Sequence, residues 1–226
     1  MRAASNFERN GFDIVPESFP AADIDALVDA LAAHPVARSR AGIRHAMQNP
    51  AVAELARDSR LCGFASSLLG GQALPYRATL FDKSPDSNWL VVWHQDTALP
   101  RREHDPSAGW GPWSRKEGVH YAHAPASALR EVLALRLHLD DSTLENGPLR
   151  VLPGTHRLGV FGDDELHVLS EQVQPVDCLT PKGGVVAIRP LLVHASSKSK
   201  SELRRRVLHI EYTSAEAFEH LQLAVA

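Results

Sequence analysis

The feature that most limits the fold of this 226-residue chain is a change of pattern at the pair Gly70-Gly71. Before the pair, apolar residues recur at helical spacing. After it, seven short runs with β-strand character follow one another, separated by Gly and Pro turns. These runs cover residues 76–83, 89–93, 132–139, 149–152, 173–178, 185–188 and 207–212. Short strands in series predict a sandwich or barrel, so we expect a mainly β fold with flanking helices.

The region before the change predicts a helical flank. We expect a short strand within 7–15, an amphipathic helix over 20–31 and one or two helices within 52–68, with a C-terminal cap at Gly70. The sequence contains no internal repeat and no low-complexity linker. A chain of this length suits one domain. We therefore expect a single domain over 1–226, with its flank over about 1–71 and its β core over about 73–213.

The composition excludes several classes of protein. The net charge of −3 gives no basic excess for nucleic acid, and no stretch approaches the ~20 apolar residues of a membrane span. The opening residues lack the pattern of a secretory signal, so we expect a cytoplasmic protein. Cys62 and Cys178 are too far apart to indicate a zinc site or a disulfide framework, and we expect buried thiols. The sequence does not set an oligomeric state.

One long connection, residues 97–128, is rich in Gly and Pro but also carries Trp110, Trp113 and Tyr121. Connections of this length are functional or disordered, and disordered segments seldom carry so many aromatic residues. We therefore expect an ordered loop that packs over a site, with Trp113 as a lid residue. We expect the histidines of this loop to be solvated: His104, His120 and His123.

A metal site is predicted where two strand-like runs end. His94 and Asp96 follow the run 89–93, and residues two apart on a strand point to the same face. His194 closes the later apolar run 185–193. Two histidines and one carboxylate that leave three coordination positions open are the ligand set of non-haem iron(II) oxygenases. A His-x-Asp triplet alone often marks a surface turn, but the second histidine at a strand end favours the metal.

A cosubstrate such as 2-oxoglutarate would need a permanently charged donor for its far carboxylate, and arginine suits that role better than lysine. Arg204, Arg205 and Arg206 all follow His194 at a suitable distance. On a strand, Arg205 points to the opposite face from Arg204 and Arg206, but this alternation does not show which of the three binds the carboxylate. At least two of them are expected to lie at the surface.

Together these residues resemble the phytanoyl-CoA dioxygenase family. The resemblance spans most of the chain, and its motifs are specific in combination. They are the opening Asn10-Gly-Phe-Asp-Ile-Val15, Trp93-His-Gln-Asp96, His138-Leu-Asp-Asp141, Glu145-Asn-Gly-Pro-Leu-Arg-Val-Leu-Pro-Gly-Thr-His-Arg157, and His194-Ala-Ser-Ser197 with Arg204-Arg-Arg206. The resemblance implies a double-stranded β-helix (jelly-roll, cupin-like) core and an iron(II)/2-oxoglutarate-dependent dioxygenase. Such an enzyme hydroxylates a small organic substrate with O2 and releases succinate and CO2.

The resemblance also implies cosubstrate contacts. The family's anchoring arginine follows the distal histidine by eleven positions, which selects Arg205 here. Ser196 is similar to a hydroxyl residue that contacts the same carboxylate. Thr79 and Phe81 correspond to positions that line the pocket. Arg77 and Lys83 share their strand face, but charged residues near strand ends are more often solvated.

The run 132–139 carries two polar residues between leucines. Leu135, Leu137 and Leu139 explain one face as core, and the other face would carry Arg136 and His138 toward the metal. For Arg136 two interpretations stay open, contact with an acidic substrate or the oxoacid and a buried structural salt bridge. For His138 we expect a structural, hydrogen-bonded histidine. His156, in the Pro-Gly-Thr-His turn, is not expected to bind metal.

Two competing interpretations have other functions. A cupin-like metal-binding protein or isomerase without oxygenase activity could use the same histidines, but it has no need for Arg205. A non-catalytic scaffold with a vestigial iron site is disfavoured by the complete triad. In the related iron halogenases a small residue replaces the carboxylate ligand, so Asp96 excludes halogenation.

Overall fold

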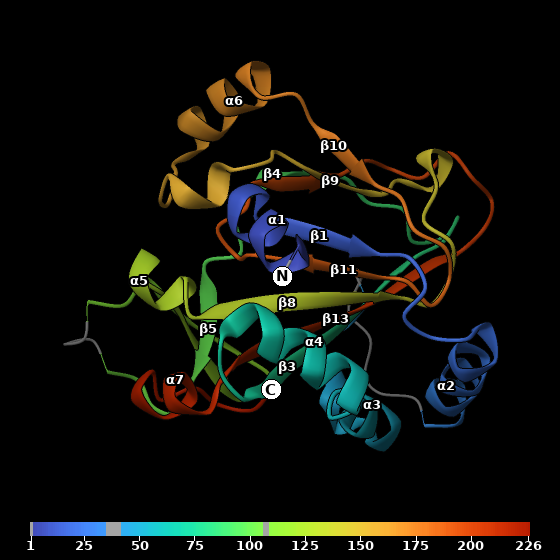
Figure 1. Ribbon diagram of the computed structural model, residues 1–226, viewed down its shortest axis with the longest axis horizontal. Helices are drawn as coiled ribbons and strands as arrows, with labels where there is room; N and C mark the ends of the chain where they lie inside the picture. Colours follow the sequence, from blue (N-terminus) through green and yellow to red (C-terminus); the bar gives the residue numbers. More distant parts are fainter. Residues whose placement is uncertain (1, 35–41, 106–108) are drawn as a thin grey trace.

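Three antiparallel sheets dominate the computed structural model, which describes residues 2–34, 42–105 and 109–226 (Figure 1). The largest has six strands in the order β1-β11-β8-β13-β3-β2. Their bounds are β1 (Phe12–Val15), β11 (Val185–Ile188), β8 (Val132–His138), β13 (Arg205–Ser214), β3 (Ala73–Lys83) and β2 (Gly42–Ile43). The N-terminal region therefore adds a strand at each edge of this sheet.

The strands of the two smaller sheets all follow Gly71 in the chain. One has the order β10-β9-β12-β4 and the other the order β5-β7-β6. Their bounds are β10 (Val176–Cys178), β9 (Leu149–Val151), β12 (His194–Ser196), β4 (Val91–His94), β5 (Ala98–Arg101), β7 (Val119–His123) and β6 (Trp113–Lys116). Figure 1 shows the four-stranded sheet above the six-stranded one.

Helices lie on both sides of the sheets. They are α1 (Arg2–Asn10), α2 (Ala21–Ala33), η1 (Ala46–Gln48), α3 (Pro50–Leu55), α4 (Ser59–Leu69), α5 (Ala126–Leu129), η3 (Leu144–Asn146), η4 (Thr155–Arg157), α6 (Asp163–Gln172) and α7 (Ala215–His220). Helices α3 and α4 pack on the outer face of the six-stranded sheet, the side that faces away from β4 and β9, whereas α6 lies beside the four-stranded one (Figure 1). Among the described helices, none is long and apolar enough to cross a membrane.

The main hydrophobic core lies between helices α3 and α4 and the six-stranded sheet. Leu61 and Ala65 of α4 pack in one cluster with Leu135 and Leu137 of β8. The prediction of a leucine core face is confirmed, because Leu135, Leu137 and Leu139 are fully buried. The alternate residues of β8 point to the other face, toward the four-stranded sheet.

The start of the chain corrects one prediction. We expected a strand within 7–15, but Phe7 to Asn10 belong to α1 and the strand begins at Phe12. Gly11 separates the two elements with a φ of +81°, a conformation that L side chains rarely adopt. A Cβ at Gly11 would also lie 2.4 Å from Nδ1 of His156, so glycine is required there. Periodicity alone does not detect so short a helix.

The other helical predictions are confirmed. Helix α2 covers the predicted amphipathic segment, and Ile24 and Leu27 are its buried residues. The predicted helices within 52–68 correspond to α3 and α4. Gly70 ends α4 in the left-handed region, with a φ of +74°, as its capping role requires.

The seven predicted strands are all present: β11 has the predicted bounds 185–188, and the other six have shifted ends. The expected strand over 173–178 begins only at Val176, because Val173 still caps α6. Helix α6 itself and the three-residue strand β12 lacked a clear sequence signal.

The connection 97–128 is not the loop that we predicted. It contains β5, β6, β7 and the start of α5, and residues 106–108 lie outside the described residues. Leu99 and Tyr121 are buried within it. The abundant Gly and Pro residues occupy turns between short strands, where backbone angles rather than apolar periodicity decide the structure.

Candidate metal and cosubstrate site

Two antiparallel strands bring the three predicted metal ligands together. In the pairing of β4 with β12, His94 lies directly opposite His194, and the centres of their rings are 4.2 Å apart. Asp96 follows β4, where its backbone N–H donates to the carbonyl of Pro190. Strand register therefore positions the histidines, and a loop contact positions the carboxylate.

The donor atoms of the triad converge. Nε2 of His94 lies 3.7 Å from one carboxylate oxygen of Asp96, and Nε2 of His194 lies 3.5 Å from the other. One ion bound at about 2.1 Å from each donor can span such separations. Among the described residues, this is the group of His, Cys, Asp and Glu side chains arranged to hold a metal ion.

Backbone contacts fix the orientation of both imidazoles. Nδ1 of His94 lies 2.9 Å from the carbonyl of Val92, and Nδ1 of His194 lies 2.8 Å from that of Leu192. Because a carbonyl only accepts, each Nδ1 must donate, which leaves the lone pair of each Nε2 for a metal. The two rings are thus held in the tautomer that a metal ligand needs.

The electrostatics of the triad also favour metal binding. Burial, and then the neighbouring His94, lower the pKa of His194 to about 3, so this ring is neutral at physiological pH. Burial raises the pKa of Asp96, but the nearby His194 and His94 outweigh it and hold the pKa well below its usual range. The site therefore offers two imidazole nitrogens and one carboxylate, which fit a divalent ion.

Gln95, between the two ligands of the triplet, holds the segment in place. Its side chain donates to the carbonyls of Gly159 (2.8 Å) and Leu191 (2.7 Å) and accepts from the N–H of Phe161 (2.9 Å). No pattern in the sequence indicates this role, because Gln95 meets these partners only in the folded chain.

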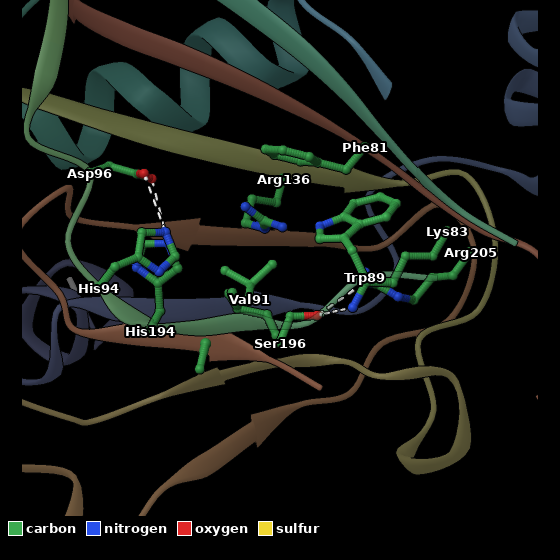
Figure 2. Close-up of a pocket in the computed structure, with 12 residues that line it drawn as sticks. Phe81, Lys83, Trp89, Val91, His94, Asp96, Arg136, His194, Ser196 and Arg205 are labelled. Carbon is green, nitrogen blue, oxygen red and sulfur yellow. Dashed lines mark hydrogen bonds and ion pairs between the residues drawn. The ribbon is translucent and has the colours of Figure 1, made fainter. Parts of the chain in front are cut away.

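The metal triad forms one end of a pocket between the two larger sheets (Figure 2). The pocket is lined by Phe81, Lys83, Trp89, Val91, His94, Asp96, Arg136, Leu149, His194, Ala195, Ser196 and Arg205. The predicted residues Phe81, Ser196, Arg205 and Arg136 are thus brought together. Thr79 and Trp113 are not among the lining residues.

Arg205, Ser196 and Lys83 form the other end of the pocket. Arg205 lies opposite Lys83 in the pairing of β13 with β3. Nζ of Lys83 donates to Oγ of Ser196 at 2.7 Å, and Nη2 of Arg205 lies 3.4 Å from the same oxygen. All three residues are buried. Lys83, for which the sequence left a pocket or a solvated position open, is only 1% exposed, because its ammonium group lies against Ser196 and the ring of Trp89.

The neighbouring arginines are occupied elsewhere. Arg204 forms an ion pair with Asp82, and Arg206 forms one with Asp140 at 2.7 Å. Arg205 forms none with the described residues and donates to the backbone carbonyl of Asn146. Of the three, Arg205 is the one with a free charge inside the pocket.

Crowded positive charge makes this end attractive to an anion. Burial, and then Arg205 and Arg136, lower the pKa of Lys83 to about 7. Burial and Arg136 lower the pKa of Arg205 to about 10. Both groups are therefore less stable as cations than in water, and a bound carboxylate would relieve this. Lys83 and Arg205 therefore fit the far carboxylate of a diacid such as 2-oxoglutarate.

The remaining predicted residues have other surroundings. His138 is buried, but neither of its ring nitrogens has a hydrogen-bond partner in the described part of the chain, which corrects our expectation of a hydrogen-bonded histidine. His156 lies in the turn η4 and contacts the carbonyl of Glu8, away from the metal. Arg77, whose position the sequence also left open, pairs with the buried Glu211.

The candidate residues of the connection 97–128 do not line the pocket. The indole of Trp113 donates to the carbonyl of Trp110, and its ring contacts His104. His104 and His123 are exposed, whereas His120 is only half-exposed. The lid role of Trp113 stays a prediction.

Sequence comparison connects this geometry to known proteins. The model of the phytanoyl-CoA dioxygenase (PhyH) family matches residues 7–207. The L-proline trans-4-hydroxylase of Streptomyces griseoviridis is 32% identical over 186 residues, which are 71% of this chain and 62% of that protein. The ectoine dioxygenase of Sphingopyxis alaskensis is 27% identical over 172 residues, 69% of this chain and 49% of that protein. The chain thus matches about half to three fifths of these relatives.

Solved structures show the fold. EctD from S. alaskensis in its apoform gives a TM-score of 0.72 at 23% identity, over 96% of this chain and 77% of that one. The epimerase SnoN in complex with Fe3+ and alpha ketoglutarate also gives 0.72, at 20% identity, over 95% and 83%. The predicted jelly-roll, cupin-like core is therefore confirmed.

Proposed function

Because the chain belongs to the phytanoyl-CoA dioxygenase family, we propose that it is an iron(II)- and 2-oxoglutarate-dependent dioxygenase. It would hydroxylate a small organic substrate and release succinate and CO2. One observation supports this most strongly. A metal triad and a buried cationic group, Lys83 with Arg205, lie at opposite ends of one pocket.

The triad would hold the iron. His94, Asp96 and His194 supply three donors and leave the other coordination positions free for a chelating oxoacid and dioxygen. Iron(II), bound together with 2-oxoglutarate, supplies the oxidising chemistry that protein side chains lack. The part of the protein is to hold the donors in register and to keep Nε2 of both histidines unprotonated.

The cationic end would hold the far carboxylate of the cosubstrate. Arg205 is permanently charged, and Lys83 and Ser196 lie within hydrogen-bonding distance of each other beside it. Val91, Leu149 and Trp89 give the pocket apolar walls. These walls exclude water, which strengthens the attraction between the cations and a carboxylate.

The substrate is proposed only as a class. Proline and ectoine, named in the relatives' descriptions, are small polar molecules, so we propose a small metabolite. Dioxygen is the other reaction partner, and we propose the cytoplasm as the place of action. The alternative, a cupin-like metal-binding protein or isomerase without oxygenase activity, gives no role to Arg205 and Lys83.

Succinate release tests the proposed function. The purified protein, supplied with Fe(II), 2-oxoglutarate and O2, is incubated with a panel of amino acids and other small metabolites. We expect succinate to form, and to form faster with the true substrate. The Asp96→Ala variant is the control. Either of two results would contradict the proposal. One is succinate formation at the wild-type rate in Asp96→Ala, and the other is no succinate from the wild-type protein with any substrate tested.

A further inference from the structure

A third cation, Arg136 of β8, lies inside the same pocket. Figure 2 shows its guanidinium between the metal triad on one side and the group of Lys83, Ser196 and Arg205 on the other. It is only 7% exposed. Its charge is thus removed from water halfway between the two ends where a chelating diacid would be held.

The contacts of Arg136 leave its charge uncompensated. Nη1 donates to Nδ1 of His209 at 2.9 Å, and the guanidinium lies 5.3 Å from the centre of the Phe81 ring. Its Nε has no hydrogen-bond partner among the residues that the structure describes. Within residues 2–34, 42–105 and 109–226, no carboxylate forms an ion pair with it. The structural salt bridge that we considered for Arg136 is therefore absent from these residues.

The groups in contact with Arg136 do not act as its counter-ion, and the carboxylate that attracts it from further away, Asp96, belongs to the metal triad. His209 accepts from Arg136 through Nδ1, so its proton is on Nε2, which faces Glu211 at 3.5 Å. Glu211 already pairs with Arg77. His138, next on the same strand face, is neutral, because burial and then Arg136 and Arg205 lower its pKa.

The charges of the pocket therefore do not balance. Three buried cations, Lys83, Arg136 and Arg205, share it with one carboxylate, that of Asp96. A metal ion at the triad would add further positive charge. A buried charge without a partner is costly and is kept where a ligand supplies the partner.

We propose that Arg136 binds the metal-proximal carboxylate of the 2-oxo acid cosubstrate. The inference rests on the proposed function. The far carboxylate is matched by Arg205 and Lys83 at the opposite end, so the near carboxylate is the anionic group of the cosubstrate that lies beside Arg136. A planar guanidinium can donate two hydrogen bonds to one carboxylate and so fix its orientation. Arg136 then fixes the orientation of the oxoacid at the metal triad, while Arg205 fixes the position of its far carboxylate.

Two ligands separate the roles of the two arginines. 2-Oxopentanoate keeps the near carboxylate and keto group of 2-oxoglutarate but lacks the far carboxylate. We would measure the Kd of both acids by calorimetry with the Zn(II)-substituted protein, which binds without turnover. The variants are Arg136→Met, Arg136→Lys and Arg205→Met. Arg136→Lys keeps the charge and covers the case in which the methionine variant fails to fold.

We expect Arg136→Met to weaken both acids by a similar factor of about 30. Arg205→Met should weaken 2-oxoglutarate by a similar or larger factor but change 2-oxopentanoate by less than about threefold. Arg136→Lys should retain part of the affinity for both. If Arg136→Met weakened only 2-oxoglutarate, or neither acid, the assignment to the near carboxylate would be overturned. If the wild-type protein bound no 2-oxoglutarate at all, the proposed function would fail as well.

Thermal unfolding without ligand distinguishes a binding role from a structural one. Arg136→Met removes an uncompensated buried charge, so the ligand-free Tm should stay the same or rise. A fall of several degrees together with unchanged binding would show that Arg136 merely supports the sheet. Arg101→Met is the matched control. Arg101 is also buried, packs over Trp110 and lies outside the pocket, so this variant should leave both Kd values unchanged.

Discussion

The two faces of the six-stranded sheet carry opposite kinds of buried side chain on the same strands. On β8, Leu135 and Leu137 point to the helices, whereas Arg136 and His138 point to the four-stranded sheet. All four are buried. The outer face gains stability from apolar contacts, and the inner face buries charge for which the described residues provide few partners. The difference teaches that burial alone does not identify the stabilising residues of this protein.

The largest expected effect comes from removing a metal ligand on the inner side. His94→Ala and Asp96→Ala should each abolish succinate formation, because two donors do not retain the ion in the required geometry. Both variants should stay folded and unfold cooperatively, since neither side chain packs in the hydrophobic core. Succinate assays and urea unfolding check this, with the exposed His123→Ala as control. Persistent turnover in either variant would show that the ligands are assigned wrongly.

Arg205→Ala should weaken 2-oxoglutarate binding by about 2 to 5 kcal/mol, the cost of removing one partner from a buried charge pair. Arg206→Ala, which removes a partly exposed ion pair with Asp140, is the matched control and should leave binding unchanged. The Michaelis constant for 2-oxoglutarate is the measurement. An unchanged constant for Arg205→Ala would assign the far carboxylate to another cation.

Leu137→Ala tests the outer face of the same strand. Leu137 is fully buried in the core, so its truncation should lower the free energy of unfolding by about 2 to 5 kcal/mol. Urea denaturation measures this. The Kd for 2-oxoglutarate of the folded variant should not change, because the side chain points away from the pocket. A large loss of 2-oxoglutarate binding with little loss of stability would show that the outer face of β8 serves binding, against the contrast between the two faces.

Lys83→Met should change the pH dependence of stability by a smaller amount. In the ligand-free protein the pKa of Lys83 is lowered from 10.5 to about 7, first by burial. Between these values the unfolded chain binds more protons than the folded one, so the contribution of Lys83 makes stability rise with pH. Below about pH 7 lysine is protonated in both states, and its full penalty is present.

Unfolding measured from pH 6 to pH 10 should therefore be less pH-dependent in Lys83→Met than in the wild type. The exposed Lys200→Met is the control. An identical pH profile in the wild type and Lys83→Met would mean that Lys83 keeps an ordinary pKa.

Trp113→Ala should give the smallest effect. The indole lies outside the pocket, so metal content and the Kd for 2-oxoglutarate should change by less than about twofold. If Trp113 acts as a lid, the variant should instead form more succinate per hydroxylated product. Loss of iron in proportion to loss of activity would show a structural role.

The sequence predicts the outer face better than the inner one. Alternating leucines and helical spacing identify the core, because apolar periodicity follows directly from burial. The candidate metal ligands His94 and Asp96 were also found from their spacing of two residues. His194 was expected to close the apolar run 185–193, but that run ends as a strand at Ile188 and His194 begins β12. Arg205 needed the family resemblance, because parity left three arginines open.

The remaining residues depend on contacts between distant segments. The sequence left the positions of Lys83 and Arg77 open, because charged residues near strand ends are more often solvated. Their partners, Ser196 and Glu211, lie more than 100 residues later in the chain. The short strands β5, β6 and β7 lack an apolar period, because turns and pairing partners define them. These contacts and strands depend on which distant segments pair and in which register, so the local sequence does not predict them.

The central claim is that the inner face holds iron and a diacid at once. An anaerobic titration of the Fe(II)-loaded protein with 2-oxoglutarate tests it most directly. The account predicts that the weak visible charge-transfer band of the chelated complex grows to saturation, and that it is lost in Asp96→Ala. A folded, iron-loaded wild-type protein that shows neither the band nor binding of 2-oxoglutarate would contradict the account.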